Sequence, residues 1–450
     1  MSLKDLSRNK WVKLGFWSVL YVAWVVWLGN YWWLFGLAVI FDVFISKKVN
    51  WTFWKKREYK EGEKPGVLIE WIDAIIFAVV VVTFINMFFF QAFKIPSSSM
   101  ESTLYTGDHL FVGKLAYGPR VPETPLTIPF THNVLPGGGK SYSTLIKNDY
   151  RRLKGFGNVK RGDCVVFGFP NGDTVLTKRP SEDYYAWVRQ AGREYVIDNF
   201  GPVMVHPMDK KDHYVKRCVA VAGDTLEVID GIVYVNGAQE PFYKGRQTSY
   251  TIRTNGQKIN PKNLEKLGIN ISEIWYDQYL PGYQALPLTD SMVEEIKSYS
   301  NVVSVEKNID SFPPDYPDSY LSIFPYMEEL GWTRDNYGPI WIPKKGESVR
   351  IDANNLPFYE RLITSYEHNT LEVGPHGKIL INGEETKSYT FKQDYFFMMG
   401  DNRHNSLDSR YWGFVPEDHI VGKPRVIWFS SDRNYKFPNN VRWGRIFKFV

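Results

Sequence analysis

Two long apolar runs near the N-terminus stand out in the pattern of hydrophobic and polar positions. The second of them, Ile72–Phe90, has 19 residues and a single charge, Asp73, near its start. A helix of this length spans about 28 Å, close to the roughly 30 Å of a bilayer's hydrocarbon core. A buried helix of a soluble protein is the weaker alternative, because no polar stripe interrupts the run. The pattern therefore predicts a transmembrane helix over residues 72–90.

The first run, Leu14–Ile45, is almost wholly apolar and is interrupted by Gly29-Asn30. Its 32 residues are too many for one upright span and few for two. Lysines flank both ends, which is typical of cytoplasmic ends. A turn at Gly29-Asn30 would then give a hairpin of two short spans, and one long tilted span is the alternative. The run is too long and too aromatic for a cleavable signal peptide.

Charge is distributed unevenly along the chain. Residues 1–64 carry eleven Lys or Arg and five Asp or Glu, which leaves 43 basic and 44 acidic side chains in the rest. Because basic loops beside apolar segments are retained in the cytoplasm, we predict a multi-pass protein of the cytoplasmic (inner) membrane. Its body, from residue 91 onward, is then extracytoplasmic or periplasmic. This near-neutral body offers no broad basic face for nucleic acid, so the lipid bilayer is the expected surface partner.

The rest of the chain is typical of a mainly β protein. Short runs rich in Val, Ile, Phe and Tyr lie between Gly, Pro, Asn and Asp, for example at 164–167, 214–222 and 395–399. Residues 225–237 and 370–385 each predict a β-hairpin, because two such runs flank a Gly-containing turn. We therefore expect a membrane-anchored, antiparallel β-sheet body.

Two stretches, 118–157 and 240–366, have a different composition and are interpreted as insertions. The second is rich in Pro, Tyr, Asn and Asp, with short helical patches at 291–299 and 357–366. We expect it to be α+β or irregular, to cap the β core and to be peripheral to the chemistry. The predicted order is a membrane hairpin (1–46), a basic cytoplasmic loop (47–71), a transmembrane helix (72–90), the first part of a catalytic β core (91–239), the insertion (240–366) and the second part of the core (367–450).

Cysteine use is sparse. The chain has two cysteines, Cys164 and Cys218, which excludes a disulfide-rich scaffold and a four-cysteine metal site. One disulfide between them is an alternative to two small buried side chains in strands, and the second interpretation is favoured. The sequence also contains neither HExxH nor CxxC, and its eight histidines form no recognisable group with a serine and an acid. We therefore expect no metal site and no cofactor.

Three short stretches combine residues that can carry chemistry. Ile95–Leu104 places a serine cluster directly after the last apolar run, which alone indicates only a polar loop. Tyr214–Asp224 places Lys216 inside an otherwise apolar strand, where it either reaches water at the strand edge or is buried. Burial would lower its pKa toward neutrality and make it a base. Gly400–Gly413 is dense in hydrogen-bonding side chains between apolar strands, as in a loop that holds a neighbouring group still.

In this order after a membrane anchor, the three stretches resemble the conserved boxes of bacterial type I signal peptidases, and Arg161–Phe167 resembles a further box between the first two. The resemblance implies that Ser99 is the nucleophile and Lys216 the general base. It assigns Ser97 to the oxyanion hole, with the backbone N–H of Ser99. It implies three supporting residues, of which Ser406 orients the lysine amine while Asp408 and Arg410 pair to brace the loop. It also implies substrate pockets lined by Ile95, Pro96, Met100, Leu104, Tyr214 and Val215.

The implied activity is that of a serine endopeptidase that removes signal peptides from exported preproteins. Such substrates carry small residues at positions −1 and −3. This chain departs from the pattern at His404, where many relatives carry an acid, and at Ser98, where many carry glycine. Two alternatives remain: a catalytically inactive, membrane-tethered scaffold protein, and another Ser/Lys protease such as a self-cleaving repressor.

Overall fold

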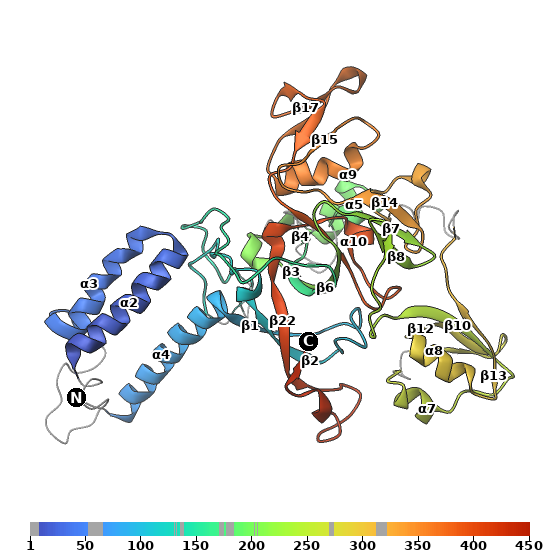
Figure 1. Cartoon of the computed structure of the whole chain (residues 1–450), viewed down its shortest axis with the longest axis horizontal. Helices are drawn as coiled ribbons and strands as arrows, with labels where there is room; N and C mark the ends of the chain where they lie inside the picture. Colours follow the sequence, from blue (N-terminus) through green and yellow to red (C-terminus); the bar gives the residue numbers. More distant parts are fainter. Residues whose placement is uncertain are drawn as a thin grey trace.

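The computed structural model places a group of apolar helices at one side of a β body (Figure 1). It describes residues 9–52, 66–129, 131, 133–135, 139–170, 175–176, 184–201, 203–204, 206–269, 274–311 and 322–450. Two of its helices, Lys10–Leu28 and Val67–Phe88, are long and apolar enough to cross a membrane.

The first apolar run folds into a helical hairpin. Helix α2 (Lys10–Leu28) ends at Gly29, whose φ of 62° is left-handed, and η1 (Tyr31–Phe35), α3 (Gly36–Phe41) and η2 (Asp42–Ser46) run back beside it (Figure 1). Glycine suits this position because it has no Cβ to clash in the left-handed region. The predicted turn is confirmed, and the single long helix is wrong. Most of the predicted loop 47–71 lies outside the described residues.

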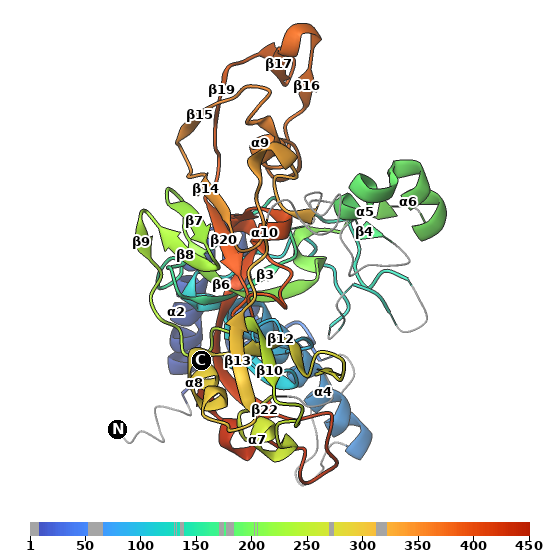
Figure 2. The same ribbon diagram turned by 90° about the vertical axis from the view of Figure 1, so that its right-hand side faces the viewer.

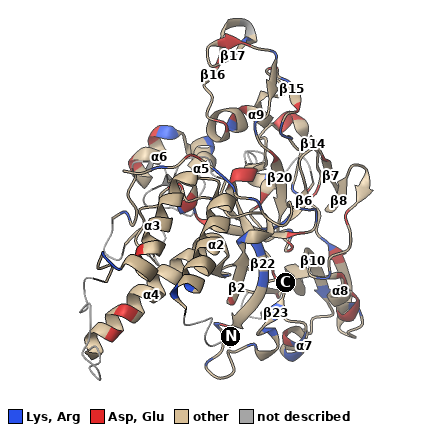
Figure 3. Ribbon diagram, turned by 60° about the vertical axis from the view of Figure 1, so that its left-hand side comes forward, with Lys and Arg blue, Asp and Glu red and all other residues tan. Residues whose placement is uncertain are grey.

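Helix α4 (Val67–Phe88) is the second apolar helix. It carries almost no charge, and its acidic residues lie near its N-terminal end (Figure 3). It begins five residues before the predicted start and ends two before the predicted end. Strand β1 (Phe90–Lys94) takes over because its backbone pairs with β2 (Asp108–Gly113). Pairing with a distant strand thus overrides the helical continuation of the apolar run.

The main sheet is antiparallel and joins segments that are far apart in the sequence. Its strand order is β1-β2-β22-β3-β6-β20-β21, with β23 paired to β22. The strands not yet placed are β3 (Cys164–Gly168), β6 (His213–Ala220), β20 (Tyr395–Met399), β21 (Val415–Pro416), β22 (Ile420–Ser430) and β23 (Lys448–Phe449). The three predicted core strands are therefore confirmed, although β6 ends two residues early.

Both predicted hairpins are present. The first, β7 (Thr225–Ile229) and β8 (Ile232–Val235), turns at Asp230-Gly231, where both residues have positive φ. It forms a second sheet in the order β14-β7-β8-β9, with β9 (Ala238–Gln239) and β14 (Tyr337–Trp341). The second hairpin joins β16 (Leu371–Val373) to β17 (Ile379–Ile381) and β18 (Glu384–Glu385), and it extends away from the body (Figure 2).

The stretch 240–366 contains an ordered lobe of strands and helices, which agrees with the α+β alternative rather than the irregular one. Four antiparallel strands in the order β11-β12-β10-β13 pack against α7 (Pro261–Lys266) and α8 (Asp290–Lys297). The strands are β10 (Thr248–Thr254), β11 (Tyr276–Asp277), β12 (Gly282–Leu288) and β13 (Val302–Lys307). The lobe has its own buried core, which includes Ile252, Leu264 and Ile296. The predicted helical patches are confirmed as α8 and as α9 (Leu356–Arg361) with η7 (Leu362–Tyr366).

The remaining elements are short. In the stretch 118–157, the described residues form only isolated bridges such as Arg120↔Arg152, as an irregular segment would. The other elements are η3 (Lys114–Ala116), β4 (Val175–Leu176), α5 (Tyr184–Ala191), α6 (Arg193–Phe200), β5 (Val203–Met204), η4 (Met208–Lys210), η6 (Glu328–Leu330), β15 (Ser348–Arg350), η8 (Pro375–Gly377), β19 (Ser388–Thr390), α10 (Ser409–Trp412), η9 (Glu417–His419) and η10 (Trp443–Arg445).

The two cysteines lie on neighbouring strands, β3 and β6, and both are buried and free. The disulfide alternative is therefore wrong, and the interpretation as small buried side chains is confirmed. Burial raises the pKa of the Cys164 thiol to about 11, so the thiol stays protonated at neutral pH.

Candidate active site

Ser99 lies in a turn that directly follows β1. Ile95 at the start of the turn is tied to β2 by two backbone hydrogen bonds, Ile95 N to Asp108 O and Gly107 N to Ile95 O. On the other side of Ser99, Met100 and Leu104 are fully buried, and the Leu104 N–H donates to the Met100 carbonyl at 2.7 Å. These apolar anchors fix the turn, which leaves Ser99 itself only 8% exposed.

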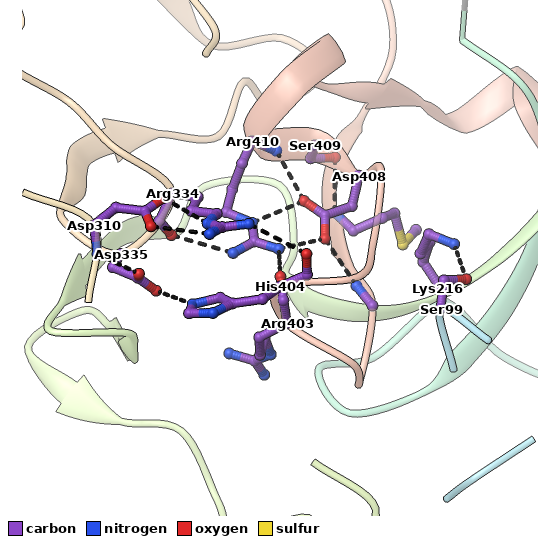
Figure 4. A network of polar contacts seen from close by, with 12 residues as sticks. Ser99, Lys216, Asp310, Arg334, Asp335, Arg403, His404, Asp408, Ser409 and Arg410 are labelled. Carbon is purple, nitrogen blue, oxygen red and sulfur yellow. Dashed lines mark hydrogen bonds and ion pairs between the residues drawn. The ribbon is translucent and has the colours of Figure 1, made fainter. Parts of the chain in front are cut away.

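Lys216 lies in the middle of the main sheet, on β6. It pairs with Val165 of β3, and β20 covers the other edge of β6. Its Nζ donates to Ser99 Oγ at 2.6 Å and to the Val215 carbonyl at 3.2 Å (Figure 4). The predicted proximity of the serine and the lysine is confirmed. The lysine is 3% exposed, so the alternative of a strand-edge lysine that reaches water is wrong.

Burial controls the protonation of this lysine. Loss of hydration disfavours the ammonium form and lowers the pKa of Lys216 to about 8, although the carboxylates of Asp408 and Asp401 act in the opposite direction. A substantial fraction of the amine is therefore neutral slightly above physiological pH. A neutral amine 2.6 Å from a hydroxyl oxygen can accept the hydroxyl proton.

The carboxylate of Asp401 ties the lysine strand to the serine turn. It accepts two hydrogen bonds from the Arg217 guanidinium, at 2.7 and 2.6 Å, and one from Thr103 Oγ at 2.6 Å. Asp401 is fully buried, and two-point pairing with arginine is the strong form of this contact. Since Arg217 follows Lys216 directly, Asp401 fixes the strand and the turn relative to each other. Sequence reasoning did not assign Asp401, Arg217 or Thr103, although all three lie inside the recognised stretches.

The loop from Gly400 to Gly413 also contacts the serine turn directly. The Asn402 N–H donates to the Ser99 carbonyl at 3.1 Å, and Asn402 Nδ2 donates to the Ser98 carbonyl at 3.3 Å. Asn405 Nδ2 donates to Ser98 Oγ at 2.9 Å. The hydroxyl of Ser98, which sets this chain apart from a glycine at the same place, is thus used as an acceptor.

An ion pair braces the loop from within. Arg410 donates to the two oxygens of Asp408 at 2.9 and 2.8 Å, and both side chains are buried (Figure 4). Burial alone would raise the pKa of Asp408, but the adjacent Arg410 outweighs it and the pKa is lowered. The ionised carboxylate also accepts the Gly400 N–H at 3.1 Å. The predicted pairing of Asp408 with Arg410 is confirmed.

Comparison with known proteins shows the family to which this chain belongs. A family model described as "Signal peptidase, peptidase S26" matches residues 68–280 and 342–429, about two thirds of the chain. The chain belongs to this family. Its relatives include the signal peptidase I of Helicobacter pylori strain J99, 26% identical over 84% of this chain and 91% of the relative. The signal peptidase I of Buchnera aphidicola subsp. Acyrthosiphon pisum is 24% identical over 93% of this chain and 94% of the relative. That of Haemophilus influenzae is 25% identical over 84% of this chain and 74% of the relative.

Ser406 is the one supporting residue that the structure places differently. Its Oγ meets no partner at full hydrogen-bonding geometry in the described part of the chain, although it lies near enough to Asp408 to help lower that pKa. The predicted hydrogen bond to the Lys216 amine is therefore absent. The hydroxyl is instead packed against Gly400, where an added Cβ would lie 2.2 Å from Ser406 Oγ and 2.6 Å from the Ser99 carbonyl. This close approach requires glycine.

The residues predicted to line the substrate pockets fall into two groups. Ile95, Met100 and Leu104 are buried in one apolar cluster against which Val215 packs. Tyr214 stacks on Phe169 in the neighbouring cluster, with ring centroids 4.6 Å apart. The pocket residue Pro96 is exposed, as is Ser97, the residue assigned to the oxyanion hole.

The stretch 240–366, expected to be peripheral to the chemistry, is nevertheless attached to the loop beside Ser99. None of the side chains described in this stretch comes between Ser99 and Lys216, which are in direct contact. Its first residues bond to the loop after Gly400: Gln247 N donates to the Asp401 carbonyl at 2.8 Å, and the Gln247 carbonyl accepts from Arg403 N at 2.9 Å. The lobe that follows is thus fastened directly to the active-site loop.

Proposed function

We propose that Ser99 is the nucleophile and Lys216 the general base with which this chain removes signal peptides from exported preproteins. The observation that carries the proposal is the 2.6 Å contact between Ser99 Oγ and a buried lysine amine whose pKa is about 8. A serine hydroxyl is a weak nucleophile and needs an adjacent base. Serine–lysine pairs are an alternative to the serine–histidine–aspartate triad.

The reaction then follows in two halves. Neutral Lys216 takes the proton of Ser99 Oγ while the oxygen forms a bond to the scissile carbonyl carbon. The resulting ammonium gives this proton to the leaving amine as the C–N bond breaks, and the signal peptide remains bound as an ester of Ser99. Lys216, neutral again, takes a proton from water, which attacks the ester carbonyl. The lysine then returns the proton to Ser99 Oγ as the peptide leaves.

The developing oxyanion needs hydrogen-bond donors on the side from which the substrate arrives. We assign this role to the Ser97 hydroxyl and the Ser99 N–H. Ser97 is exposed and lies two residues before the nucleophile, in the turn that the buried Met100 and Leu104 hold in place. A donor held in position before the reaction stabilises the charge without reorganisation of the site.

The pocket residues support a preference for small side chains at positions −1 and −3. Ile95, Met100 and Leu104 are already packed against one another, so the surface that they offer beside Ser99 is shallow and apolar. A small side chain can be buried there without displacing the cluster, whereas a large one would require repacking.

The helical hairpin and α4 support attachment to the cytoplasmic membrane, with the lipid bilayer as partner. We propose that all three apolar helical segments enter the bilayer and that the body lies on the extracytoplasmic side. Protease added outside intact spheroplasts should digest the body and spare the loop 47–71. Protection of the body would contradict this orientation.

The test of the activity uses the full chain in detergent with a purified preprotein. Wild type should release the mature fragment, and mass spectrometry should locate the cut after a small residue. Ser99→Ala and Lys216→Arg should both lose activity at least about 10³-fold, because arginine keeps the charge but cannot give up its proton. Lys297→Arg, at an exposed lysine of α8, is the matched control and should be fully active. Substantial cleavage by Lys216→Arg would rule out the base, and no cleavage by wild type would favour the scaffold alternative.

A further inference from the structure

A buried hydrogen bond joins the active-site loop to a segment outside the family match. His404 of the loop and Asp335, which precedes β14, approach to 2.8 Å between Nε2 and Oδ1 (Figure 4). Their side chains are 3% and 1% exposed. A carboxylate only accepts hydrogen bonds, so the proton of this bond is on His404 Nε2. Asp335 lies in the interval 281–341, which the family model does not cover.

The segment that carries Asp335 is itself anchored to the β core. The Asp335 carbonyl accepts the N–H of Gly231, at the tip of the β7–β8 hairpin, at 2.8 Å. The second oxygen of the Asp335 carboxylate accepts the Asp310 N–H at 2.9 Å. Burial by itself would raise the pKa of Asp335, but the hydrogen bond and charge of His404 outweigh it, and the pKa is lowered. Asp335 is thus a fixed anion and not a mobile side chain.

Arg334, the preceding residue, contacts the same loop at two points. Its guanidinium pairs with Asp310 and donates to the His404 carbonyl at 3.2 Å. Its own carbonyl accepts from Arg410 Nη1 at 3.1 Å. Arg410 is the residue that holds Asp408, and Asp408 in turn accepts the Gly400 N–H. A continuous series of contacts therefore leads from Asp310, Arg334 and Asp335 to the residues beside Ser99 and Lys216.

We propose that Asp335 and His404 act together as positioning residues, which hold the active-site loop where Asn402 bonds to the Ser99 carbonyl. The inference rests on the proposed function, because it takes Ser99 and Lys216 as the reacting pair. Without the His404–Asp335 contact, the loop loses the side-chain bond that holds His404 from outside, while the contacts of Arg334 and the inner contacts of Asp408 remain. The serine turn can then shift relative to Lys216, and a displacement of about 1 Å in such a site costs on the order of 100-fold in rate.

A double-mutant cycle tests this proposal on the full chain in detergent. Asp335→Ala, His404→Ala and the double variant are compared with wild type for kcat and KM on one preprotein. We expect each single variant to lose about 10- to 100-fold in kcat with KM changed less than about twofold. The double variant should lose no more than the worse single variant, because residues that act as a unit are not additive. Losses that multiply, or single variants with wild-type kcat, would overturn the proposal.

A pH profile separates positioning from a general loss of folded protein. A loosened loop admits water to Lys216 and relieves its desolvation, so the midpoint of the acid limb of kcat/KM should move to higher pH in the single variants. A smaller folded fraction would lower the amplitude and leave the midpoint in place. If the alanine variants do not fold, the Asp335→Asn variant tests the positioning role in their place. It keeps the volume and the acceptor oxygen, and we expect about a threefold loss of kcat with the same shift of midpoint; wild-type values for both would overturn the proposal.

Two controls distinguish the loss of positioning from other effects of the substitutions. Glu294 and Lys297 form an exposed ion pair on α8 of the same lobe. The corresponding alanine cycle there should leave kcat at the wild-type value. Ser99→Ala is measured in parallel: its inactivity together with wild-type behaviour of the Asp335 variants would refute the positioning role alone, whereas activity of Ser99→Ala would refute the proposed function itself.

Discussion

Burial of the Lys216 amine, which the proposed mechanism uses in its neutral form, carries a cost in stability, and this cost can be measured. The pKa of Lys216 falls from the ordinary lysine value of 10.5 to about 8 on folding. At 1.4 kcal/mol per tenfold change in protonation, the fall corresponds to about 3 kcal/mol of destabilisation at neutral pH, where both the folded and the unfolded chain hold the proton. Lys216→Met has a similar length and no charge. After subtracting about 1 kcal/mol for the lost hydrogen bond to Ser99, we expect it to raise the free energy of unfolding by about 2 kcal/mol at pH 7.

The same pKa shift predicts the direction in which the stability of the wild-type protein changes with pH. Between about pH 8 and pH 10.5 the unfolded wild-type chain binds a proton that the folded chain does not, so wild-type stability rises with pH through this window. Lys216→Met has no such proton, and its advantage should shrink over the same window and be lost above it.

Urea titration of the full chain in detergent at pH 7 and pH 10, followed by circular dichroism of the β body, measures both effects. Ser99→Ala is the matched control, because it removes the same hydrogen bond and keeps the amine. A Lys216→Met protein less stable than wild type at pH 7, with an unchanged pH dependence, would refute the account of Lys216 as a desolvated amine.

Three further predictions concern the surroundings of the pair. Ser97→Ala should lower kcat about 10²- to 10³-fold with KM nearly unchanged, as expected for loss of one oxyanion donor, and steady-state kinetics on a preprotein would show it. Arg217→Lys should lose one of the two bonds to Asp401 and lower both kcat and the unfolding temperature, because lysine cannot pair at two points. Cys164 should resist alkylation at pH 8 in the folded protein and react after unfolding, as mass spectrometry of the alkylated protein would show.

Ser99 and Lys216 could be proposed from the sequence because three short stretches together resemble the boxes of one family, and the structure brings the two side chains into contact. Lys216 stands out as a charge within an apolar strand, and the serine stretch follows an apolar run of membrane length. The main strands were predicted because the composition of each run is enough to indicate a strand. The β1 strand was missed because Phe90–Lys94 continues the apolar run of α4, and only its pairing with β2 makes it a strand.

Contacts between distant parts of the chain could not be predicted in this way. His404 and Asp335 are 69 residues apart and belong to different elements, so neither position alone indicates the other. The insertion was predicted only as α+β or irregular, and its strand order could not be predicted because the four strands are separated by two short helices and by turns rich in Pro and Asn. Ser406 was placed wrongly because the resemblance assigns it a role, whereas the position of its hydroxyl depends on how closely Gly400 approaches the Ser99 carbonyl.

The arrangement of charges explains how a lysine beside two carboxylates can still have a lowered pKa. Asp401 and Asp408 both act to raise the pKa of Lys216, and unpaired they would hold its proton. Each is instead bound at two points by an arginine, Arg217 and Arg410 respectively. The arginines cannot lose their own protons, so they neutralise the carboxylates permanently and allow desolvation to dominate at the amine. The two ion pairs therefore fix the loop and also leave the Lys216 amine able to lose its proton, as the proposed mechanism requires.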